Sequence, residues 1–101
     1  MIDLPPAQLE TVKRILSEYV PRCAVWVFGS RIRQAAKAWS DLDLAVVGED
    51  RLEPQLFGNL KEAFEGSDLP IRVDVLDWHA ISPEFQAVIK KGYEVLQESD
   101  S

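Results

Sequence analysis

The sequence predicts a small α/β (α+β) domain in which a mixed sheet of three to four strands is flanked by helices. The run 24–28 is too short and too rich in β-branched and aromatic residues for a helix, and 42–47 is a second apolar stretch. A third stretch, 71–75, alternates apolar and charged residues, as a half-buried strand does. Segments with helical apolar spacing lie before, between and after these strands, which indicates a sheet covered by helices.

Prolines and apolar periodicity mark the expected helices in the first two thirds of the chain. The first begins at Pro5-Pro6, because proline is tolerated in the first turn of a helix, and ends near Val20. A short basic helix is expected over 31–38, between the first two strands. A third helix begins at Pro54 and stops at Gly66-Ser67.

The last third of the chain predicts one more helix and an edge strand. Ser82 precedes Pro83 and is the expected N-cap of this helix. Its inner face is expected to consist of Phe85, Val88 and Ile89. The edge strand is expected over 93–96, followed by a short tail.

Length and composition predict a single domain, 1–101, expressed in the cytoplasm. At 101 residues the chain can build one core but not two. No apolar run approaches the roughly 20 residues that span a bilayer, and the N-terminus lacks a secretory pattern. The single Cys23 cannot form an internal disulfide, which suits a reducing compartment.

Charge argues against direct binding of nucleic acid. The net charge is −6, whereas neutralising phosphates requires an excess of lysine and arginine. The charge is uneven: residues 1–40 carry six Lys/Arg against three Asp/Glu, a balance of +3, and residues 41–101 carry five against fourteen, a balance of −9. The basic excess therefore surrounds one candidate functional turn, and the acidic excess contains the candidate metal ligands.

That turn is Gly29-Ser30, which follows the first strand directly, and ten residues later come Asp41 and Asp43. Alternate side chains of a strand share a face, so the two carboxylates point the same way with Cα atoms about 6.5 to 7 Å apart. Carboxylate oxygens suit Mg²⁺ bound together with substrate phosphates. A Gly-Ser turn before a helix offers backbone N–H groups to a phosphate. Both halves together predict a nucleotide–metal site, although each alone is also found as a plain turn or a solvated strand end.

A third carboxylate is expected from Asp74, which faces away from the apolar side of its strand. Asp77 is the fallback, but it lies beyond the alternating segment and is expected in a turn. Three acidic residues on adjacent strand ends can surround two metal ions about 3.5 to 4 Å apart, the geometry used for in-line displacement at phosphorus. Asp74 is also the expected acceptor of the attacking hydroxyl's proton. Its plain alternative is an exposed strand residue.

Several other side chains are weaker candidates. Arg31 is the expected cationic phosphate contact, because it lies in the turn. Whether the nucleotide or a partner contacts the remaining basic and aromatic candidates is left open by the sequence; these are Arg33, Lys37, Trp39 and Trp78.

The spacing Gly29-Ser30, ten residues, then Asp41-Leu42-Asp43 resembles the signature of the nucleotidyltransferase superfamily that includes DNA polymerase β. The later Val73-Asp74-Val75 and the closing segment 81–96 resemble its minimal nucleotidyltransferase (MNT) branch, the antitoxins of HEPN/MNT toxin–antitoxin systems. The similarity runs from about residue 12 to residue 96. One departure is Arg31-Ile32-Arg33-Gln34, where many relatives have a second arginine and a glycine after Gly-Ser-Arg.

The resemblance implies a Mg²⁺-dependent enzyme that transfers AMP from ATP to a tyrosine of a partner HEPN-domain ribonuclease toxin and so acts as its antitoxin. A hetero-oligomer with that toxin is expected, because 101 residues barely complete the catalytic core and leave the acceptor to another chain. Two alternatives stay open. One is an antitoxin that neutralises the toxin by binding alone, and the other is a small-molecule nucleotidyltransferase that works with a separate acceptor-binding chain.

Overall fold

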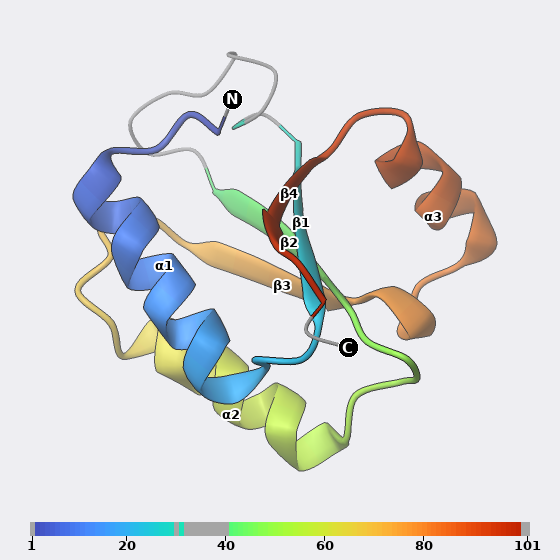
Figure 1. The fold of residues 1–101 in the computed structure, drawn as a ribbon, viewed down its shortest axis with the longest axis horizontal. Helices are drawn as coiled ribbons and strands as arrows, with labels where there is room; N and C mark the ends of the chain where they lie inside the picture. The colour runs from blue at the N-terminus through green and yellow to red at the C-terminus, as the bar shows by residue number, and fades with distance from the viewer. Residues whose placement is uncertain (1, 30, 32–40, 100–101) are drawn as a thin grey trace.

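A computed structural model describes residues 2–29, 31 and 41–99. Among these residues the chain forms three α-helices, a short 3₁₀ helix and one four-stranded sheet (Figure 1). In chain order the elements are α1 (Pro6–Tyr19), β1 (Ala24–Phe28), β2 (Leu42–Val47), α2 (Pro54–Glu65), β3 (Val73–Asp77), η1 (Trp78–Ala80), α3 (Pro83–Lys90) and β4 (Glu94–Gln97).

The sheet is mixed, with strand order β3-β2-β1-β4, which confirms the predicted fold class. β1 pairs antiparallel with both β2 and β4, whereas β2 and β3 run parallel. The connection from β2 to β3 contains α2, as a parallel crossover requires. β3 therefore forms one edge of the sheet and lies directly beside β2, the strand that follows the Asp41 region.

The two faces of the sheet are covered unequally. α1 and α2 pack on one face, and α3 lies on the other (Figure 1). The main core lies under α1 and α2, and its fully buried members include Val12, Leu16, Val25, Val27, Leu42, Leu44, Val46 and Leu60. A smaller cluster under α3 consists of Ala45, Trp78 and Ile89. Part of the second face is consequently left open beside α3.

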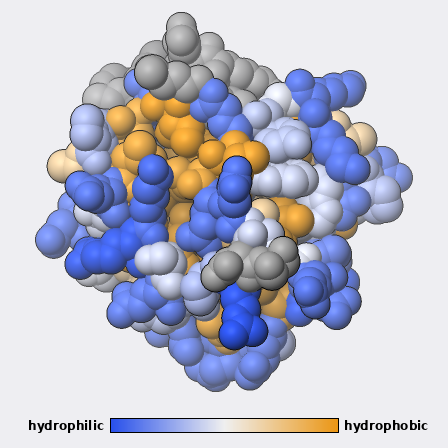
Figure 2. All heavy atoms as spheres, in the orientation of Figure 1, coloured by the Kyte–Doolittle hydropathy of each residue, from blue (hydrophilic) through white to orange (hydrophobic). Residues whose placement is uncertain are grey.

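Seen from the side of α1, the surface is mostly hydrophilic, with an apolar area between α1 and β4 (Figure 2). Leu96 of β4 contributes its buried side chain to the main core. In the described part of the chain, no helix is both long and apolar enough to cross a bilayer.

Most predicted boundaries agree with the structure, and two expectations were wrong. β1 and β2 have the predicted bounds, but β3 begins and ends two residues later than 71–75. Its bounds follow from pairing with β2, which extends from Leu42 opposite Val73 to Val46 opposite Asp77. Asp77 is thus the last residue of a strand and not a turn residue. The expected helix over 31–38 lies outside the described residues, apart from Arg31.

The second error concerns the inner face of α3. Ser82 caps this helix as predicted, because its hydroxyl accepts a hydrogen bond from the Phe85 N–H at 3.2 Å. Of the three expected core residues only Ile89 is buried, whereas Phe85 and Val88 are 37% and 50% exposed. One residue of α3 suffices to fill the small cluster on Ala45 and Trp78, so the other two apolar side chains stay at the surface.

Candidate active site

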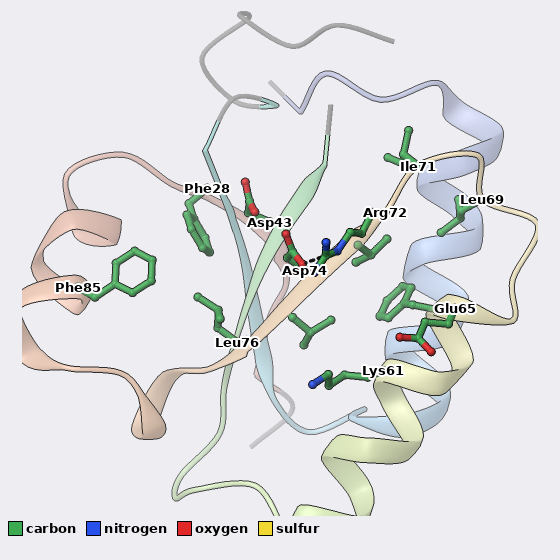
Figure 3. A pocket seen from close by; sticks show the side chains of 13 residues that line it. Phe28, Asp43, Lys61, Glu65, Leu69, Ile71, Arg72, Asp74, Leu76 and Phe85 are labelled. Atoms are coloured by element: carbon green, nitrogen blue, oxygen red, sulfur yellow. Dashed lines mark ion pairs between the residues drawn. The ribbon is translucent and has the colours of Figure 1, made fainter. Parts of the chain in front are cut away.

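Asp43 and Asp74 lie side by side on the neighbouring parallel strands β2 and β3. Asp43 on β2 is in register with Asp74 on β3, on neighbouring strands about 4.8 Å apart. Their neighbours Leu42 and Leu44 are fully buried under the helices, so alternation directs the two carboxylates to the open face. Figure 3 shows both side chains among those that line one pocket. The parallel pairing thus joins two predicted site residues that are 31 positions apart.

Asp41 adds a third negative charge to this pair. It lies one residue before β2, so it shares the face of Asp43, and it is exposed. Burial, together with the negative charges of Asp74 and Asp41, raises the pKa of Asp43 to about 6. The three predicted carboxylates therefore act on one another electrostatically.

The donor set suits a hard divalent cation. Carboxylate oxygens are the ligands that Mg²⁺ prefers, and a cation would relieve the repulsion that adds to the effect of burial on the pKa of Asp43. Across residues 2–29, 31 and 41–99, however, no three acidic, histidine or cysteine side chains are arranged as a ready-made metal cluster. Asp74 instead forms an ion pair with Arg72, with 3.0 Å between the Arg72 Nε and the Asp74 Oδ1.

Gly29 brings the backbone close to the same carboxylates. Among the described residues, Gly29 is the glycine with a positive φ angle, +87°. It directly follows Phe28, which is in register with Asp43 on the neighbouring strand. A Cβ at position 29 would collide with Oδ2 of Asp43. The chain therefore leaves β1 through a conformation that favours glycine, in contact with the candidate ligand. Ser30, the second residue of the predicted phosphate turn, lies outside the described residues.

Arg31 lies in this turn, but its side chain points into the protein. Only 4% of its surface is exposed, and its Nη1 donates a hydrogen bond to the Asp3 carbonyl at 3.0 Å. The Asp3 N–H in turn donates to the Arg31 carbonyl at 2.7 Å. Arg31 thereby fastens the turn to the N-terminal segment, and a direct phosphate contact by its guanidinium stays a prediction.

The remaining candidates separate into packing residues and residues outside the description. Trp78 is buried and contacts Trp26 edge to face, with 5.0 Å between ring centroids, so it is a packing residue. Arg33, Lys37 and Trp39 lie outside the described residues. Asp77, the fallback carboxylate, is buried, and its oxygens accept hydrogen bonds from the Leu52 and His79 N–H groups at 2.8 and 3.1 Å. It anchors two loops and faces away from Asp43.

A pocket of about 500 Å³ adjoins the carboxylates, within the range typical of small-molecule sites. Asp43, Asp74, Phe28, Leu76 and Phe85 line one part of it, and side chains of α2 and of the segment leading into β3, among them Lys61, Glu65 and Leu69, line another part (Figure 3). Sequence reasoning did not assign Phe28, Leu76 or Phe85 to the site. Their signal was ambiguous, because apolar residues at strand or helix spacing are more often found in the core.

A mixed sheet that presents two strand-borne carboxylates beside a glycine turn offers oxygen ligands to a cation and a backbone turn to a phosphate. The family model described as "Polymerase beta, Nucleotidyltransferase" matches residues 10–101. The chain belongs to this nucleotidyltransferase family. It is 48% identical, over 98% of its length and 87% of the relative's, to a probable protein adenylyltransferase MntA of Haemophilus influenzae.

Solved structures support the same fold. A toxin–antitoxin crystal structure with AMP-PNP matches 91% of this chain and 74% of its own at 22% identity, with a TM-score of 0.75. A complex of tri-AMPylated Shewanella oneidensis HEPN toxin with MNT antitoxin matches 92% of this chain and 71% of its own at 19% identity, with a TM-score of 0.62. At these identities the likeness establishes the shared fold.

Proposed function

We propose that this protein is a Mg²⁺-dependent protein adenylyltransferase that transfers AMP from ATP to a tyrosine of a partner HEPN ribonuclease toxin, and so acts as the toxin's antitoxin. The observation that carries the proposal is the parallel register of Asp43 and Asp74 on one open face, with Asp41 beside them. The relative named a probable protein adenylyltransferase, 48% identical over nearly the whole chain, supports the acceptor being a protein.

The residues divide the reaction between them. Asp41, Asp43 and Asp74 would hold Mg²⁺, two ions in this proposal, which offsets the negative charge developing on the phosphates. Gly29 and Ser30 offer the turn that receives the triphosphate, and Arg31 holds that turn in place. Asp74 accepts the proton of the tyrosine hydroxyl.

The chemistry balances as an in-line displacement. The phenolic oxygen of the acceptor forms a bond to the α-phosphorus of ATP, and the bond from that phosphorus to the oxygen bridging to the β-phosphate breaks. Pyrophosphate leaves with the bonding electrons, and AMP stays on the tyrosine as a phosphodiester. The phenol's proton passes to the Asp74 carboxylate and from there to solvent.

Mass spectrometry of the partner tests the proposal. The protein is incubated with ATP, Mg²⁺ and the product of the neighbouring gene, and the partner is weighed and sequenced by fragmentation. An AMP-sized gain on a tyrosine that disappears when Mg²⁺ is chelated is the expected result. Tight binding without a mass gain would instead identify an antitoxin that acts by binding alone. Absence of both would favour a small-molecule nucleotidyltransferase.

A further inference from the structure

An apolar wall borders the carboxylates on the open face of the sheet. It consists of Phe28 at the end of β1, Leu76 on β3 and Phe85 on α3, all of which line the same pocket as Asp43 and Asp74. The Phe28 and Phe85 rings meet edge to face, with 6.0 Å between centroids and 88° between planes. Figure 3 shows Phe85 pointing toward Phe28 and Leu76 lying below them.

Within this wall, Phe28 packs against the small core cluster under α3, whereas Phe85 is an exposed side chain. Ile89 fills the cluster between α3 and the sheet, and Phe85 lies one helix turn before it with 37% of its surface exposed. An exposed aromatic residue that lines a pocket beside charged groups is typical of a ligand contact. Phe85 is thus available to a molecule that enters the pocket.

The direction of the reaction assigns this contact to one substrate. In an in-line displacement the leaving pyrophosphate and the attacking oxygen lie on opposite sides of the phosphorus. Because β1 runs antiparallel to β2, Gly29 continues past the Phe28–Asp43 pair toward the Asp41 end of β2, and the proposed triphosphate turn puts the leaving pyrophosphate at that end. On β3, Leu76 follows Asp74 in the opposite direction, on the same face and in register with Ala45. The acceptor therefore enters on the side of Leu76.

We propose that Leu76 and Phe85, backed by Phe28, form the subsite that receives the aromatic ring of the acceptor tyrosine and directs its hydroxyl toward Asp74. This inference rests on the proposed function and specifies what that function selects. An apolar wall stabilises a phenol ring by removing its faces from water, and aromatic rings contact one another favourably at centroid distances of about 4.5 to 7 Å. A serine or threonine acceptor has no ring to fill the wall, so the subsite selects tyrosine.

The test compares steady-state AMP transfer by the full-length wild type and by Phe85→Ala and Leu76→Ala, with the partner toxin as acceptor. Each variant is expected to lower kcat/KM for the toxin about tenfold, mainly through a higher KM, as truncation of a buried apolar contact does. The Kd for AMP-PNP with Mg²⁺ should stay within about twofold of the wild type. Phe85→Tyr, which keeps the ring, should restore most of the activity.

Val88→Ala is the matched control. Val88 also lies on α3 and is 50% exposed, but it does not line the pocket, so its replacement should leave both constants unchanged. The subsite also predicts a change in selectivity. A toxin with serine in place of the acceptor tyrosine should be a much poorer substrate than the native toxin for the wild type, and this preference should shrink for Phe85→Ala.

Two outcomes overturn the inference while sparing the proposed function. If Phe85→Ala weakens AMP-PNP binding as much as transfer, the wall contacts the adenine base. If it transfers AMP to the toxin as well as the wild type does, the wall contacts neither substrate. A wild type that transfers no AMP to the toxin overturns the proposed function and this inference together. Thermal unfolding of each variant, with Phe85→Leu as a second replacement, separates these outcomes from simple loss of folding.

Discussion

The side-chain oxygen Oδ2 of Asp43 occupies the space that a Cβ at Gly29 would need. Gly29 also has φ +87°, a conformation that costs most other residues about 1 to 2 kcal/mol. We therefore expect Gly29→Ala to lower the free energy of unfolding by at least that amount and to displace the Asp43 carboxylate. AMP transfer should fall more than a hundredfold, because misplacement of a catalytic group by about 1 Å can cost that much.

Gly58→Ala is the matched control for this prediction. Gly58 lies within α2, and a Cβ there meets nothing within 4 Å. Alanine in a helix interior is favoured over glycine by about 0.5 to 1 kcal/mol, so this variant should be slightly more stable and fully active. Thermal unfolding and transfer rates of the two variants give the comparison. If Gly29→Ala and Gly58→Ala have the same stability and the same transfer rate, the Gly29 turn has no special role.

The raised pKa of Asp43 predicts a pH-dependent stability in the metal-free protein. The folded value of about 6 lies above the ordinary value of 3.8, so the folded state binds more protons between these pH values. The free energy of unfolding should therefore fall as pH rises from about 4 to 6, and stay lower above that. For a half-buried carboxylate screened by solvent, we expect about 1 kcal/mol from this group.

Asp43→Asn isolates that contribution from the titration of other groups. The difference in unfolding free energy between variant and wild type should shift in favour of the variant as pH rises from 4 to 7, in denaturant titrations with EDTA. Millimolar Mg²⁺ should bring the wild type closer to the variant at pH 7.5, because a bound cation favours the charged carboxylates. If the difference in unfolding free energy between Asp43→Asn and the wild type does not change with pH, ionisation of Asp43 does not destabilise the folded protein.

Asp41 offers a test of the catalytic role that spares the fold. It is exposed at the entry to β2, outside the core, so Asp41→Asn should change the unfolding temperature by no more than a few degrees. Loss of one carboxylate ligand should nevertheless abolish AMP transfer at low millimolar Mg²⁺. Asp50→Asn, at an exposed position after β2, serves as the control of equal charge change. Unchanged transfer by Asp41→Asn would exclude Asp41 from the mechanism.

The sequence predicted those elements whose ends carry their own local signals. Pro21 and Gly29 bracket β1, and Gly48 closes β2, so both strands were placed correctly. The ends of β3 depend on its partner: the Leu42 N–H donates to the Arg72 carbonyl, and pairing continues to Asp77. Such a boundary depends on tertiary pairing, so the alternation of residues within one segment cannot predict it.

The same limit applies to the site. Alternation predicted that Asp43 and Asp74 face away from the core, but their proximity depends on β3 being the parallel neighbour of β2. Apolar spacing on α3 likewise predicted Phe85 as a core residue, although it lines the pocket. Helical periodicity reports which residues share a face, and the packing partner decides whether that face meets the core or a ligand.

The ion pair between Arg72 and Asp74 competes with the proposed metal. The two side chains are 75% and 37% exposed, and a pair at such a surface is worth about 0.2 to 1 kcal/mol. Freeing Asp74 by Arg72→Ala should therefore raise the affinity for Mn²⁺, used as a spectroscopic substitute for Mg²⁺, by up to about fivefold. Arg51→Ala removes the same charge from an exposed position that does not line the pocket, and so corrects for the general effect of net charge. If Mn²⁺ affinity rises equally in the two variants, Arg72 acts only through its contribution to the net charge. If Mn²⁺ affinity falls in Arg72→Ala, the arginine holds Asp74 in its metal-binding position.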